Sequence, residues 1–108
     1  CINVGKKLST STITSVYTCP SFYRSTVDVI TLMNTSTSAR TITLEWTDSS
    51  NSDTAYKIAK NKSVPAESYV HLGINLVLEA GDILKATASV SDSFELTLSV
   101  TEEYIPQA

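Results

Sequence analysis

The sequence predicts an all-β protein, an antiparallel β-sandwich of about eight strands that is either immunoglobulin-like or a jelly roll. Short segments rich in β-branched and aromatic residues are separated by polar turn signals about every 8–12 residues. Several of these segments alternate apolar and polar residues, as half-buried strands do. No stretch keeps the helical period of about 3.6 residues over several turns, so no substantial helix is expected.

The central part of the chain, residues 63–87 (SVPAESYVHLGINLVLEAGDILKAT), gives the clearest succession of strands and turns. It predicts three strands separated by two tight turns, with the strands at residues 68–72, 75–78 and 83–87. Gly73 is expected to break the first strand, and Gly81 to take the positive φ that the second turn requires. Pro65 precedes the first strand, where its missing N–H costs no ladder hydrogen bond.

The remaining strands are predicted at residues 12–19, 24–33, 41–47, 55–59 and 94–100. Ile42, Leu44 and Trp46 share one face of their strand, which is assigned to the core, and Tyr56 and Ile58 are also expected to point inwards. The last strand directs four apolar side chains inwards: Phe94, Leu96, Leu98 and Val100.

Residues 24–33 differ from the other strands because they carry apolar side chains on both faces, with Val27 and Val29 on one and Ile30 and Leu32 on the other. This pattern is typical of a central strand that is covered on both sides in its second half. The polar turn that follows, residues 34–38, is expected to satisfy itself, since its short side chains can bond their own backbone.

A single domain is expected over residues 1–108, with an N-terminal arm or first edge strand at about 1–11 and a short tail at about 101–108. Two cysteines and one histidine do not make a zinc site, so Cys1 and Cys19 are expected to be free thiols that could pair only in an oxidising compartment. A Cys at position 1 is also what a bacterial lipoprotein shows after signal cleavage, although a truncated start is the simpler expectation.

The composition excludes several classes of partner. The net charge of −3 and the pI of about 4.9 argue against nucleic-acid binding, which needs a basic face. The apolar runs are far shorter than the roughly 20 residues that span a bilayer, so no membrane partner is expected. With 16 Ser and 15 Thr, the outward faces of the predicted strands carry hydroxyl groups in place of charges.

No enzymatic activity is expected, because the residues needed for catalysis do not come together. His71 is the one histidine, and its alternation with Tyr69 predicts a half-buried or interface position. Glu102 and Glu103 are adjacent on a strand, so their side chains diverge and they are interpreted as a solvated chain end. No catalytic, cofactor-binding or metal-binding residue is assigned, and no cofactor is expected.

Two candidate binding sites in the sequence have simpler explanations. Asp48, Asn51 and Asp53 have oxygen ligands at a spacing suited to calcium, but the loop lacks the Gly and Glu of an EF-hand and is predicted to be a polar turn. The aromatic residues could form a sugar-stacking platform, although the position of Trp46 beside Leu44 favours the core. The aromatic candidates are Trp46, Tyr17, Tyr23, Tyr56 and Tyr69.

The order of several segments between residues 26 and 100 resembles that of a known class of protein. The segments are NTSTS (34–38), TITLEW (41–46), VPA (64–66), LVLEAGD (76–82) and ILKATA (83–88). This order is similar to that of small β-sandwich virion proteins of tailed bacteriophages. The pattern is structural and contains no catalytic signature.

The resemblance implies a head decoration (cement) protein that clamps neighbouring subunits of the major capsid protein on the outer surface of the virion. It also implies a homo-oligomer, with a trimer favoured. Two other classes stay open. One is a tail, collar or fibre-associated virion protein. The other is a carbohydrate-binding or adhesin module, including a surface lipoprotein, for which exposed aromatic residues or an upstream signal peptide would be expected.

Overall fold

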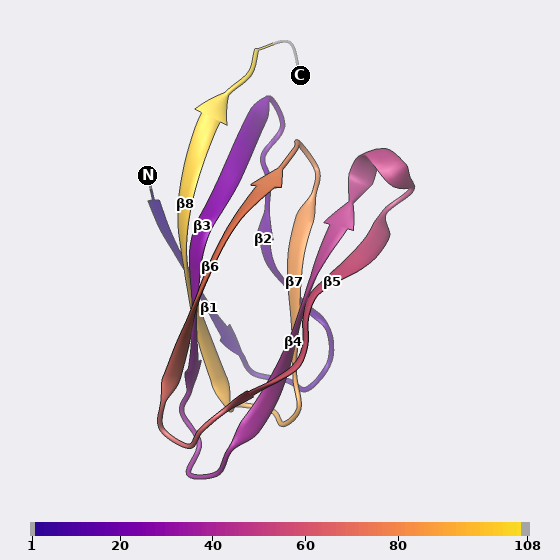
Figure 1. Cartoon of the computed structure of the whole chain (residues 1–108). Coiled ribbons are helices and arrows are strands. Elements are labelled where there is room, and N and C mark those ends of the chain that lie inside the picture. Colours follow the sequence, from indigo (N-terminus) through magenta and orange to yellow (C-terminus); the bar gives the residue numbers. More distant parts are fainter. Residues whose placement is uncertain (1, 107–108) are drawn as a thin grey trace.

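The computed structural model describes residues 2–106 as a sandwich of two four-stranded antiparallel sheets (Figure 1). The first sheet has the order β1-β8-β3-β6, with strands β1 (Ile2–Leu8), β8 (Phe94–Tyr104), β3 (Tyr23–Asn34) and β6 (Tyr69–Leu78). The second has the order β2-β7-β4-β5, with strands β2 (Thr14–Thr18), β7 (Ile83–Ala88), β4 (Arg40–Asp48) and β5 (Thr54–Val64). The predicted all-β sandwich is confirmed.

Helical structure within residues 2–106 is limited to η1 (Ser49–Asn51), a 3-10 turn between β4 and β5. Asp48 caps this turn by accepting a hydrogen bond from the Ser50 N–H. Over the same part of the chain, no helix has the length and apolar character needed to cross a membrane.

The connectivity decides between the two predicted sandwich types. Each strand lies in the opposite sheet from its predecessor, except that β4 and β5 form a hairpin within the second sheet. Eight strands divided four and four in this order make a jelly roll, which contains two Greek keys. In an immunoglobulin-like sandwich, other pairs of consecutive strands share a sheet, and seven strands divide into sheets of four and three. The fold is therefore a jelly roll.

The core lies between the two sheets and is built from the side chains that point inwards from the strands of both sheets. Leu, Ile, Val and Phe side chains of this kind each contribute roughly 1.5–3 kcal/mol on burial. The predicted inward faces of residues 41–47 and 94–100 are confirmed, with Trp46 only partly buried at the margin of the core. The largest fully buried side chains are Phe94, Leu8, Ile30, Leu32, Ile42, Leu44, Leu78, Leu84, Leu96, Leu98, Val27 and Val64.

The strand predicted at residues 24–33 is confirmed as a central strand, but the expectation that it is covered on both sides is wrong because β3 contains a β-bulge. Val27 pairs with Val100 of β8, and the next pair is Val29 with Ser99, so Asp28 is an extra residue in β3. The bulge reverses the alternation after Val27. Val27 is fully buried and Val29 is 36% exposed, while Ile30 and Leu32 join Val27 in the core. Strand β3 is therefore covered on one face only.

Gly73 does not break the strand that contains it. Strand β6 continues from Tyr69 to Leu78, with an irregular register near Asn75, whose φ is +46°. Because β6 is an edge strand and pairs with β3 alone, this irregularity interrupts only one ladder of hydrogen bonds. Strand β5 is also longer than predicted, since Asn61, with φ +52°, introduces a bulge where a connection was expected.

The two ends of the chain are more regular than expected. Of the two alternatives for the first residues, an arm or an edge strand, the structure shows an edge strand that pairs with β8 from Ile2 to Leu8. At the other end β8 continues to Tyr104, which pairs with Tyr23, so residues 101–104 of the expected tail are strand. Cys1 lies outside the described residues, and with it the question of whether it pairs with Cys19.

The turn between β6 and β7 is confirmed, and it depends on Gly81. The Asp82 N–H donates to the Glu79 carbonyl at 2.9 Å, and Gly81 has φ +90°. A Cβ at Gly81 would lie 3.1 Å from Ser49 Oγ. We expect Gly81→Ala to lower the free energy of unfolding by about 1–2 kcal/mol, measured by chemical denaturation. Gly5→Ala is the control, because a Cβ there meets nothing within 4 Å, and an equal loss in both variants would contradict this explanation.

Candidate functional site

One end of the sandwich, at the top of Figure 1, gathers three connections and the end of β8. The connections are those between β2 and β3, between β4 and β5, and between β6 and β7. A shallow cleft of about 290 Å³ lies among them and is lined by Tyr23, Arg24, Ser49, Ser50, Glu79, Ala80 and Ile105. Arg24 is engaged in an ion pair with Glu103.

Asp82 holds this end together. Its side chain is 1% exposed and accepts hydrogen bonds from three residues on two loops and a strand. Oδ1 accepts from Ser49 N at 3.0 Å and from Ser49 Oγ at 2.9 Å. Oδ2 accepts from Glu79 N at 3.0 Å and from Trp46 Nε1 at 3.2 Å. The carboxylate therefore satisfies buried donors of the β4–β5 and β6–β7 connections at once.

The same hydrogen bonds fix the ionisation of Asp82. Burial alone would raise the pKa of this carboxyl, but the donors from Ser49, Glu79 and Trp46 outweigh burial and hold the pKa below its ordinary value. A carboxyl with a lowered pKa in the folded state contributes stability that is complete above the unfolded pKa of about 4 and is lost as the pH falls through the folded pKa.

We therefore expect the stability advantage of the wild type over Asp82→Asn to shrink as the pH falls below about 4. Asparagine keeps the shape of the side chain but does not titrate, so the difference between the two proteins isolates this carboxyl. Urea denaturation at a series of pH values from neutral to about 2 measures the difference. A gap that stays constant across this range would contradict the assignment.

His71 lies on the outer face of β6 and is exposed, so the half-buried position expected for it is wrong. Its Nδ1 is 2.9 Å from Thr31 Oγ1, and its ring lies 4.8 Å from that of Tyr69. Within residues 2–106, no carboxylate hydrogen-bonds to the ring to orient it as in a catalytic triad. Its two neighbours, Thr31 and Tyr69, lie on the same outer face of the first sheet.

Glu102 and Glu103 diverge as expected, but only one of them is a solvated end of the chain. Glu103 is exposed and pairs with Arg24. Glu102 accepts a hydrogen bond from the Tyr17 hydroxyl, which also contacts Ser25 Oγ at 2.7 Å. Burial, with the bond to Glu102, raises the pKa of Tyr17 well above its ordinary value. Glu102 thus ties β8 to β2 across the sandwich.

In the loop of Asp48, Asn51 and Asp53, the first two residues use their side chains in short-range hydrogen bonds within the loop and to the start of β5. Asp48 Oδ1 accepts from Ser50 N at 3.1 Å and from Ser50 Oγ at 2.7 Å, and Asn51 Nδ2 donates to Tyr56 Oη at 3.1 Å. These are the bonds of a polar turn. Over residues 2–106, no group of three or more His, Cys, Asp or Glu side chains is placed to hold a metal ion.

The aromatic residues do not form a common platform. Trp46 stacks on Tyr56 with ring centroids 5.3 Å apart and donates its Nε1–H to Asp82, so one face and the polar edge of the indole are engaged. Tyr23 contacts Tyr104 at the end of the first sheet, and Tyr69 lies on β6. Trp46 therefore packs against the core, as the sequence indicated, but is only partly buried there.

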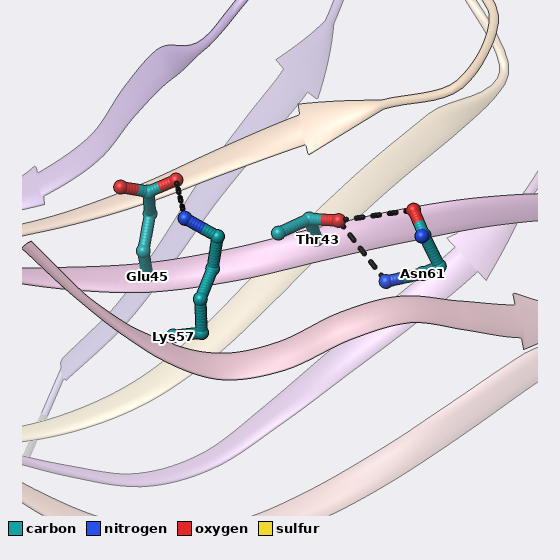
Figure 2. Close-up of polar contacts among 4 residues, drawn as sticks. All are labelled: Thr43, Glu45, Lys57 and Asn61. Atoms are coloured by element: carbon teal, nitrogen blue, oxygen red, sulfur yellow. Dashed lines mark hydrogen bonds and ion pairs between the residues drawn. The ribbon is translucent and has the colours of Figure 1, made fainter.

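The outer face of the second sheet is polar but carries little net charge. Figure 2 shows the contacts that join β4 to β5 there. The Lys57 Nζ lies 3.3 Å from Glu45 Oε1, and Thr43 Oγ1 accepts from the Asn61 N–H at 3.0 Å. These contacts span the bulged part of the β4–β5 ladder. The register also places a set of accessible hydroxyl side chains on this face: Ser15, Thr18, Thr41, Thr43 and Thr87.

No protein-family model matches the sequence, and no curated protein matches it. Among solved structures, PirA aligns with a TM-score of 0.55 and 13% sequence identity, over 92% of this chain and 93% of that chain. A chain in the structure of infectious bursal disease virus Gx strain aligns with a TM-score of 0.54 and 10% identity, over 94% of this chain and 29% of that chain. The jelly roll thus corresponds to less than a third of the virus chain.

A pentameric capsid protein isolated from metagenomic phage sequences aligns with a TM-score of 0.44 and 16% identity, over 94% of this chain and 61% of that chain. This last alignment is too loose to support an argument. At the identities found, the first two alignments establish a shared fold alone. The chain has the fold of a domain found in a virus structure and of PirA.

Proposed function

We propose that this chain is a non-enzymatic structural protein of a bacteriophage virion that decorates the outer capsid surface and clamps neighbouring major capsid subunits. The jelly-roll connectivity carries the proposal, because viral capsid domains are prominent among the proteins that use this architecture. The likeness to a chain of infectious bursal disease virus supports the virion class. The sequence resemblance over residues 26–100 supports the tailed-phage origin and the decorating role.

The surfaces fit a protein that works by contact. The outer face of the second sheet carries hydroxyl side chains, and so does that of the first, with Thr26, Thr31, Thr97 and Thr101. Hydroxyl groups cost less to remove from water than charges do, so such faces can be covered by a neighbour at a modest desolvation cost. A decorating protein also needs a rigid body, which the continuous core between the two sheets supplies.

Lectin domains and cupins also use the jelly roll, so the carbohydrate-binding alternative needs an argument of its own. A sugar platform requires an open aromatic face. Trp46 has one face against Tyr56 and its N–H on Asp82, and the other aromatic residues lie on different elements. The geometry favours the structural role over sugar binding.

Intact particles from the source sample test the proposal. Quantitative mass spectrometry should find the chain in hundreds of copies per particle, and cryo-electron microscopy should place the jelly roll on the outside of the shell. About a dozen copies at the tail would replace the decorating role with that of a tail or fibre component. Absence from every particle would overturn the virion assignment.

Purified protein and capsids that lack it identify the face that meets the shell. Thr87→Lys and Thr97→Lys place one charge on the outer face of the second and the first sheet, respectively. We expect one of the two variants to lose occupancy at least about tenfold, because an unpaired charge would be buried in that contact. Unchanged occupancy in both variants would argue against either sheet face as the contact.

A further inference from the structure

The four edge strands of the sandwich differ in how they discourage pairing with another chain. Charged residues, short length and bulges are the usual protections of an edge. Strand β1 carries Lys6 and Lys7, β5 carries Lys57, Lys60 and Lys62, and β2 is five residues long and bulged. Strand β6 is ten residues long and contains no Lys, Arg, Asp or Glu. Its irregularity near Asn75, where φ is +46°, is the one protection of this kind that β6 has.

The core is open on the flank between β5 and β6. These strands border different sheets and do not pair with each other. They contribute six of the partly buried hydrophobic residues that contact the core: Ile58, Ala59, Val70, Leu72, Ile74 and Leu76. The opposite flank, between β1 and β2, contributes two, Val4 and Tyr17. On its outer face β6 also exposes Tyr69 by 58% and Val77 by 50%.

We propose that a second copy of this chain covers the flank, with the β6 strands of the two copies paired antiparallel about a two-fold axis near Gly73. A two-fold contact must be self-complementary, and the sequence of β6 meets this requirement. With Gly73 on the axis, Val70 lies opposite Leu76 of the other copy and Leu72 lies opposite Ile74, so the inner face pairs apolar residues throughout. On the outer face, exposed Tyr69 lies opposite exposed Val77. His71 lies opposite Asn75, so the irregularity of β6 falls inside the contact, once in each copy.

Gly73 suits a position on the axis. A Cβ built there meets nothing within 4 Å, so the missing side chain is not explained by crowding inside one copy. Pairing would join the two first sheets into one continuous sheet of eight strands and would bury the partly exposed side chains of the open flank. The contact is independent of the virion role, and it produces a dimer where the sequence resemblance favours a trimer.

The charges near the axis predict a salt dependence. The exposed lysines of β5 border the same flank, so pairing would bring the lysine-bearing edges of the two copies towards each other. Like charges at a rim oppose association, and salt screens them over about 8 Å at physiological ionic strength. The dimer should therefore become tighter as the NaCl concentration rises, whereas binding of an acidic partner to the lysines would become weaker.

The test compares Gly73→Lys with Gly5→Lys by sedimentation velocity over a range of concentrations up to about 100 µM. Both glycines lie in edge strands of the first sheet with open space around a built Cβ, so each variant should fold. Gly73→Lys places two like charges together at the axis and should raise the dimer dissociation constant at least about 100-fold. Gly5→Lys should dimerise as the wild type does. Circular dichroism confirms that both variants are folded, and Val77→Lys replaces Gly73→Lys if that variant does not fold.

A covalent test is independent of affinity. In a Cys1→Ser background, Gly73→Cys should form a disulfide-linked dimer on mild oxidation, and Gly5→Cys should remain monomeric. A wild type that stays monomeric at about 100 µM would overturn the proposal. So would a trimer, or any oligomer whose dissociation constant Gly73→Lys leaves unchanged.

Discussion

Replacing Asp82 with alanine is expected to lower the free energy of unfolding by about 3–4 kcal/mol. The carboxylate is 1% exposed and accepts bonds from Ser49, Glu79 and Trp46. Its removal leaves several donors without a partner, and an unsatisfied buried donor costs about 1–3 kcal/mol. Water entering from the adjacent cleft recovers part of the loss, which keeps the expected total below the sum of the separate costs. Urea denaturation at neutral pH measures the effect.

Glu79→Ala is the matched control, because Glu79 is an exposed carboxylate in the same turn. Its removal should change stability by less than about 0.5 kcal/mol. Trp46 gives a local readout, since its Nε1–H donates to Asp82 and its emission should shift to longer wavelength when that bond is lost. Equal effects of the two substitutions would show that charge in this turn, and not the buried network, determines stability.

The sequence predicted the parts of the fold that depend on alternation. The inward faces around Leu44 and Leu98 follow from a period of two residues, and that period is imposed by one buried face of a sheet. The turn at Gly81 follows from the need for a positive φ. These features are local, so neighbouring residues contain the whole signal.

The bulges could not be predicted in the same way. The bulges at Asp28 and Asn75 are defined by the register with a neighbouring strand. The neighbours of β3 are β6 and β8, and both lie far from it in the sequence. A bulge changes which side chains face the core without changing their composition. Alternation alone therefore places Val29 on a second buried face of the strand, whereas its side chain lies on the surface.

The surfaces on which the two proposals rest were predictable in composition but not in position. Hydroxyl-rich outer faces follow from the Ser and Thr content and the alternation of the strands. The open flank at β6 does not, because it depends on which strands lie at the edges of the two sheets. Likewise Asp82 is one of several acidic residues in polar turns. Its structural role arises only because the β4–β5 and β6–β7 connections lie side by side in the fold, so that both donate hydrogen bonds to it.

Asn34 is a buried polar residue that holds together one end of the sandwich, opposite the end that Asp82 holds together. Its side chain is fully buried, and its Nδ2 donates to the carbonyls of Ser38 and Val64 at 2.9 and 3.0 Å. Its Oδ1 accepts from Ser36 N at 2.9 Å and from Ser36 Oγ at 2.8 Å. The turn at 34–38 was expected to need nothing beyond itself, but the bond to Val64 ties it to the end of β5.

We expect Asn34→Ala to lower the free energy of unfolding by about 2–3 kcal/mol, because the buried Val64 carbonyl and the Ser36 N–H lose their partner. The exposed Ser38 carbonyl keeps the bond from Ser36 Oγ. Thr37→Ala, an exposed position in the same turn, should change it by less than about 0.5 kcal/mol.

Asn34→Asp separates geometry from bonding, since it keeps the shape of the side chain but sets a carboxylate oxygen against the Ser38 and Val64 carbonyls. It should be at least as destabilising as alanine at neutral pH and should recover partly in acid, where the protonated carboxyl can donate one bond. Denaturation of the three variants at neutral and acidic pH measures this, and an Asn34→Asp variant as stable as the wild type at neutral pH would contradict the assigned donors.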